Sequence, residues 1–123
     1  MPSSSEAPSS QALSVDVVTH GSEQAVVSVS GELDVATAML LHHHLAAQLA
    51  QGRRHLVIDL AGVPFMDSSG LNIVLRTMNE TRDIGGSLRL AAPAAPVQRV
   101  LELTGVTLTV PVHATVEQAL AHR

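Results

Sequence analysis

The feature that most constrains the fold is the segment His55-Leu56-Val57-Ile58-Asp59-Leu60, which is short and almost wholly apolar. A strand with one face in water alternates apolar and polar residues, and this segment has too few polar residues for that pattern. We therefore expect a central strand that is covered on both faces. A strand of that kind lies inside a sheet with helical cover.

The residues before this segment predict a hairpin. Leu13, Val15 and Val17 alternate with polar residues, as on a half-buried strand, and residues 25–30 read Ala-Val-Val-Ser-Val-Ser. Between them, residues 20–23 have the composition of a turn. The two strands are therefore expected to pair with each other.

Helical spacing follows on both sides of the central segment. Residues 35–51 predict a helix with Asp34 as its N-cap and Gly52 as its stop, and its apolar positions are Met39, Leu41, Leu45 and Leu49. A second helix is expected from the 67–70 corner to about residue 83, where Gly85-Gly86 follows.

The remaining elements alternate in the same way. We expect a strand over 87–91, a helix from Pro96 to Leu103 that closes on Gly105, a strand over 106–110, and a short helix over 115–121 with Thr115 as its cap. The order β-β-α-β-α-β-α-β-α predicts an α/β fold, with a mixed β-sheet of about five strands covered by about four helices.

The corner Asp67-Ser68-Ser69-Gly70 places two hydroxyls and a carboxylate where a helix begins. The first N–H groups of a helix have no partner inside it, so polar oxygens are stabilised there, and a phosphate is tolerated. Taken alone, Ser68 could be a plain capping serine.

Composition excludes several classes of function. The 123 residues include no cysteine, so disulfides and cysteine-based metal sites are impossible. A net charge of −4 and a single aromatic residue, Phe65, argue against nucleic-acid binding. No apolar stretch reaches the roughly 20 residues that span a bilayer. We expect a cytoplasmic protein with no membrane or direct nucleic-acid partner, made of a disordered Ser/Pro/Ala-rich tail over residues 1–12 and a single domain over residues 13–122.

Three segments together resemble the STAS domain family, and in particular the free-standing bacterial anti-sigma factor antagonists. They are Gly31-Glu32-Leu33-Asp34, Val57-Ile58-Asp59-Leu60 and Phe65-Met66-Asp67-Ser68-Ser69-Gly70-Leu71. Gly85-Gly86 and Leu103-Thr104-Gly105-Val106 also fit the family pattern, so the resemblance covers roughly residues 13–121.

The resemblance implies a regulator of transcription. Proteins of this family bind an anti-sigma factor that is a serine kinase, and thereby release a sigma factor. The kinase phosphorylates the first serine of the motif, here Ser68, and a phosphoserine phosphatase restores it. The resemblance puts Asp34 on the partner-facing surface, together with Asp67, Ser68, Ser69 and Gly70. It implies partner switching by a protein that is not an enzyme and that needs no cofactor.

Several alternatives stay open for these residues. Asp34 could act only as a cap, Asp67 could cap the helix as well as face a partner, and Ser69 is expected to be the structural cap. The main rival function is a STAS subunit of a transport or signalling complex that is not phosphorylated.

The residues argue against two alternatives, a serine hydrolase and a histidine metal site. Met66-Asp67-Ser68-Ser69-Gly70 lacks the first glycine of a nucleophile elbow, so no catalytic residue is assigned. His42-His43-His44 are consecutive on a helix and point about 100° apart, so they predict a solvated helix face and no metal site.

Overall fold

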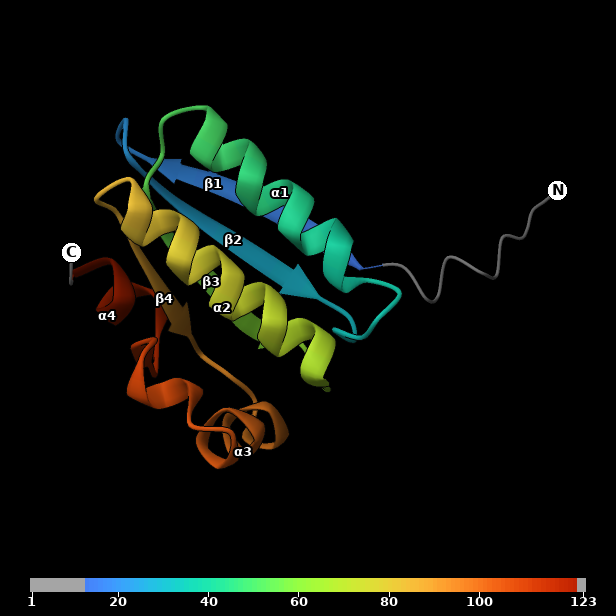
Figure 1. The fold of residues 1–123 in the computed structure, drawn as a ribbon. Helices are drawn as coiled ribbons and strands as arrows, with labels where there is room; N and C mark the ends of the chain where they lie inside the picture. Colours follow the sequence, from blue (N-terminus) through green and yellow to red (C-terminus); the bar gives the residue numbers. More distant parts are fainter. Residues whose placement is uncertain (1–12, 122–123) are drawn as a thin grey trace, which may run out of the picture.

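The computed structural model describes residues 13–121, and its elements follow the predicted order (Figure 1). The strands are β1 (Ser14–His20), β2 (Gln24–Ser30), β3 (His55–Gly62), β4 (Ser87–Ala91) and β5 (Val112–His113). The helices are α1 (Ala38–Ala50), α2 (Ser68–Asp83), α3 (Ala95–Leu103) and α4 (Val116–Ala121). The tail expected over residues 1–12, and residue 122 of the expected domain, lie outside the described residues.

The strands form one mixed sheet in which spatial order follows chain order, β1-β2-β3-β4-β5. β1 and β2 pair antiparallel as the predicted hairpin, and each later strand is parallel to its neighbour. The predicted fold class is confirmed, because five strands carry four helices in this part of the chain. Within residues 13–121, no helix combines the length and the apolar character needed to cross a membrane.

β3 is central and covered on both faces, as its composition predicted. Leu56 and Ile58 point into the larger core, and α1 and α2 lie over this face (Figure 1). Val57 points the other way and packs with Ala119 of α4. Apolar burial on both faces explains why the strand contains almost no polar side chains.

The first helix begins later than its apolar spacing predicted. α1 starts at Ala38, with Thr37 as N-cap, and residues 34–37 form a hydrogen-bonded turn instead of helix. The side chain of Asp34 accepts the backbone N–H groups of Ala36 and Thr37, which satisfies them before a helix can begin. The expected stop is present, since α1 ends at Ala50 and Gly52 has a positive φ of 93°.

The orientation of α1 also differs from the prediction. Met39 was assigned to the apolar positions of the helix, but it is 59% exposed, whereas Leu41 and Leu45 are fully buried. His42 is buried rather than solvated, because its Nε2 lies 3.1 Å from Oε1 of Glu80 on α2. The predicted solvated face is therefore wrong for His42, and His43 is the exposed member of the three.

The strand predicted over residues 106–110 is wrong. Residues Val106–Leu108 form a 3₁₀ turn, η2, and the strand follows as β5. Gly105 has a positive φ of 81° and redirects the chain, and the carbonyl of Val106 accepts from the N–H groups of Thr109 and Val110. This turn buries Val106 and Val110 in the core, so tertiary packing overrides the strand propensity of the segment.

Candidate functional site

Asp67 starts α2 and fixes the position of the two serines. Its backbone is extended, with φ −104° and ψ −170°, and its Oδ1 accepts the N–H of Ser69 at 2.8 Å. Its carbonyl accepts the N–H of Leu71 at 3.2 Å. Asp67 is thus the N-cap, and the expectation that Ser69 is the structural cap is wrong. The cap is the residue just before the first helical position, and that position is Ser68.

Ser68 is the exposed residue of the corner, whereas Ser69 is half-buried and Gly70 is buried. The hydroxyl of Ser68 makes no hydrogen bond with any residue between 13 and 121. No side chain in that range therefore activates it as a nucleophile. It is accessible to a reagent or protein from outside.

Gly70 permits close packing beneath the serines. A Cβ atom at this position would lie 2.8 Å from Cγ of Met66 and 3.0 Å from Cβ of Leu33. Both neighbours are buried and come from the loops on either side of the site. The absence of a side chain at residue 70 allows the start of α2 to lie directly on those loops.

Main-chain hydrogen bonds join the loop after β2 to the loop after β3. The N–H of Leu33 donates to the carbonyl of Phe65 at 3.0 Å, and the N–H of Asp67 donates to the carbonyl of Leu33 at 3.0 Å. Gly31 and Gly62 are linked in the same way. The segment with Asp34 therefore lies beside the segment with Asp67 and Ser68, at the carboxyl ends of two neighbouring parallel strands.

Asp34 organises its own turn. Its Oδ1 accepts from the N–H of Ala36 at 2.9 Å and from the N–H of Thr37 at 3.2 Å. Thr37 is buried, and its hydroxyl donates to the carbonyl of Glu32 at 2.6 Å. Asp34 is half-buried, so one carboxylate can stabilise the turn and still reach a surface partner.

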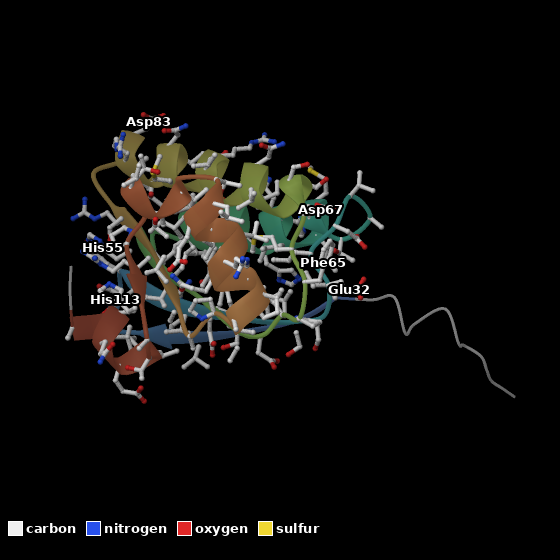
Figure 2. The ribbon with its side chains drawn as sticks, turned by 90° about the horizontal axis from the view of Figure 1, so that it is seen from below. Glu32, His55, Phe65, Asp67, Asp83 and His113 are labelled. Carbon is white, nitrogen blue, oxygen red and sulfur yellow. The ribbon has the colours of Figure 1, made fainter. Side chains whose placement is uncertain are left out.

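Exposed apolar side chains flank the corner, and the sequence analysis did not assign them to the site. Val35 is 79% exposed, Met39 59% and Phe65 48%. Figure 2 shows Phe65 at the same end of the molecule as Glu32 and Asp67. The signal available in the sequence was the only aromatic residue of the chain, standing two positions before the acidic N-cap.

The corner therefore combines an exposed hydroxyl, two ordered carboxylates and an apolar border. No group of three or more histidine, cysteine or acidic side chains in the described part of the chain is placed to hold a metal ion. The corner is an exposed surface, and its Ser68 hydroxyl oxygen can accept a group transferred from another molecule.

Comparison with known proteins places this geometry in a family. The STAS domain family model matches residues 14–119. The anti-sigma-F factor antagonist RsfB of Mycobacterium tuberculosis is 34% identical over 110 residues, which are 88% of this chain and 87% of that protein.

Solved structures agree with that match. An anti-sigma factor antagonist from Mycobacterium paratuberculosis superposes with a TM-score of 0.80 at 35% identity, covering 89% of this chain and 92% of that one. The anti-sigma factor antagonist SpoIIAA in its unphosphorylated form gives a TM-score of 0.75 at 25% identity, covering 87% and 93%. Family match, sequence relatives and fold coincide over nearly the whole described chain, and the protein belongs to the STAS domain family.

Proposed function

We propose that this protein is an anti-sigma factor antagonist that binds a serine-kinase-type anti-sigma factor, and so releases a sigma factor. Phosphorylation of Ser68 switches it off, and a phosphoserine phosphatase resets it. The observation that carries the proposal is the exposed hydroxyl of Ser68 at the first position of α2, which Asp67 caps and which has no hydrogen-bond partner among residues 13–121. RsfB, the relative described above, bears the name of an anti-sigma-F factor antagonist.

The surroundings of Ser68 suit a docked protein. Val35, Met39 and Phe65 expose apolar side chains on the two joined loops and the first turn of α1. Asp34 and Asp67 add carboxylates to the same end. A partner with an apolar centre and basic groups around it would complement this surface.

The transfer needs a base from the partner. The Ser68 Oγ–P bond forms as the bond from the γ-phosphorus of ATP to its β,γ-bridging oxygen breaks, which leaves ADP. The hydroxyl proton must go to a basic group of the kinase, because that hydroxyl makes no hydrogen bond to any residue among 13–121. An exposed acceptor that does not react by itself is what such a kinase requires.

The phosphate would act mainly on binding. A phosphoserine carries about −1.5 to −2 charges, and a helix N-terminus accommodates it. Asp67 opposes it at close range, so the two effects offset each other within the domain. A dianion in a docked interface must be desolvated or matched by charge, and an unmatched one weakens the complex. SpoIIAA, the structural relative described above, has been solved in an unphosphorylated and in a phosphorylated form.

The test is a labelling experiment with matched serine variants. The protein is incubated with candidate kinase-type anti-sigma factors and ATP, and the added phosphate is mapped by mass spectrometry. We expect label at residue 68, loss of label in Ser68→Ala, and retention in Ser69→Ala. Label that persists in Ser68→Ala would contradict the acceptor assignment. Tight binding without any label would favour the rival function, a STAS subunit that is not phosphorylated.

A further inference from the structure

A second polar site lies at the end of the molecule opposite Ser68. β5 pairs with β4 only at Leu90 and Ala91, so the first half of β4 has an open edge. A cavity of about 160 Å³ lies beside that edge. Its lining comes from the end of α2, the start of β4 and the approach to β5, and includes Arg82, Ser87, Arg89 and Pro111.

The cavity is positively charged in an acidic protein. Arg82 and Arg89 line it, and no carboxylate side chain of residues 13–121 does. Neither guanidinium forms an ion pair with a carboxylate in the described part of the chain, whereas Arg54 and Arg76 do. The whole chain carries a net charge of −4, and at this cavity two arginines without an ion pair come together. Such a cavity favours an anion.

Arg89 has a hydrogen-bond donor that is buried and unused. Its Nε atom is buried and has no hydrogen-bond partner among the described residues. An unsatisfied buried donor on a cation is costly, and an acceptor with negative charge would satisfy it. Its Nη1 lies 3.4 Å from Nε2 of His113. Because a guanidinium only donates, that ring nitrogen accepts, and the contact holds the guanidinium in place.

Ser87 can contribute a third donor. Its hydroxyl lies 2.9 Å from Nδ1 of His55. With the proton on Nδ1, His55 donates to the serine oxygen, and the hydroxyl hydrogen remains free to donate elsewhere. Figure 2 shows His55 and His113 together at one end of the molecule, with Asp67 and Phe65 at the other.

We propose that this cavity binds a small phosphate-bearing anion between Arg82, Ser87 and Arg89. Guanidinium groups pair with phosphate oxygens through two parallel hydrogen bonds, and a tetrahedral anion accepts from donors in several directions. The volume is below the roughly 300–1,000 Å³ of pockets for drug-sized ligands, so it suits one phosphate group rather than a whole nucleotide. The site is independent of Ser68.

Titration with inorganic phosphate, followed by backbone amide NMR at constant ionic strength, tests the proposal. We expect saturable shifts centred on residues 81–89 and 109–113, and a weaker response to acetate. Arg89→Gln and Arg82→Gln should each lose roughly tenfold in affinity, the value of one charge-assisted contact. Arg99→Gln, an exposed arginine on α3, is the matched control and should bind as the wild type does.

Three results would contradict parts of this proposal. Equal affinity in the Arg82, Arg89 and Arg99 variants would overturn the site, as would shifts that do not saturate. Equal affinity for acetate and phosphate would overturn the phosphate assignment. Because Arg82 is exposed, Arg82→Gln should retain the wild-type fold. Its phosphate affinity therefore tests the site even if Arg89→Gln is unstable.

Discussion

Gly70 lies in close contact with buried side chains directly beneath the two serines. In Gly70→Ala the new methyl group would meet Met66 and Leu33, which are 1% and 0% exposed and have little room to move. We expect overpacking to cost about 1–3 kcal/mol, offset in part by about 1 kcal/mol of improved helix propensity. Urea denaturation measures the net loss of stability.

The control for this variant is Asn72→Ala, two positions further along α2 and exposed. It gains helix propensity without a steric cost, so it should be as stable as the wild type or slightly more so. If both alanine variants behave alike, the contact at Gly70 does not constrain the loops.

Asp67 combines a cap with a charge, and two variants separate them. Asp67→Asn keeps an oxygen that can accept the N–H of Ser69, so its stability should stay close to that of the wild type. Asp67→Ala removes the cap and should cost about 0.5–2 kcal/mol. If the carboxylate meets a basic partner, both variants bind the anti-sigma factor more weakly, as calorimetry would show. An asparagine variant as unstable as the alanine variant would contradict the cap.

At the scale of elements, the turn over residues 34–37 contributes both to the fold and to the proposed interface. Asp34→Ala removes the acceptor for two backbone N–H groups, so we expect a stability loss of about 1–2 kcal/mol. We also expect weaker binding of the anti-sigma factor, because Asp34 belongs to the partner surface that we propose. Thermal denaturation and a binding assay on the same preparation distinguish the two effects. A lowered melting temperature with unchanged affinity would mean that Asp34 only stabilises its turn.

α3 offers a sharper test of how an element is anchored. Leu101 is fully buried and Leu103, two residues later, is 77% exposed. Leu101→Ala should lose about 2–5 kcal/mol of stability, and Leu103→Ala less than about 0.5 kcal/mol. Denaturant midpoints of the two variants measure the difference. Similar midpoints would mean that α3 does not hold the core as its burial indicates.

The elements also show how far sequence can predict this structure. β3 was predicted because its residues are almost wholly apolar over a short span, and α2 because its apolar residues have helical spacing between a capping corner and Gly85-Gly86. The 106–110 segment was mispredicted because Val-Thr-Leu-Thr-Val favours a strand locally, and only the core pocket for Val106 and Val110 decides otherwise.

The candidate site around Ser68 was also predicted only in part. The motif located Ser68 at a helix start, since capping depends on adjacent residues. The hydrogen bonds between Leu33 and residues 65–67 join segments about thirty positions apart, which no local pattern specifies. The exposure of Met39 depends on the rotation of α1 against the core, so its place at the surface could not be read from periodicity alone.

At the scale of the whole molecule, α2 runs from Ser68 to Asp83, 16 residues and roughly 24 Å, between the corner and the cavity end. The larger core fixes this helix on the sheet through Ile73 and Val74, which are 5% and 0% exposed. A rigid, well-packed helix should not transmit a local charge change as a movement. The switch we propose therefore acts by blocking the surface and leaves the fold unchanged.

Ser68→Asp tests that mechanism across the molecule. An acid suits the first turn of a helix, so the melting temperature should stay near that of the wild type while anti-sigma factor binding is lost. Backbone amide shifts should change within residues 31–38 and 62–72, which the loop hydrogen bonds connect, and stay unchanged in β1, β4 and the cavity lining. Asn79→Asp, at an exposed position of α2 far from the corner, is the control for added charge alone and should bind as the wild type does. Amide shifts that spread through the sheet would show that the switch acts by a conformational change instead of by blocking the surface. Retained tight binding of Ser68→Asp to the anti-sigma factor would contradict both mechanisms.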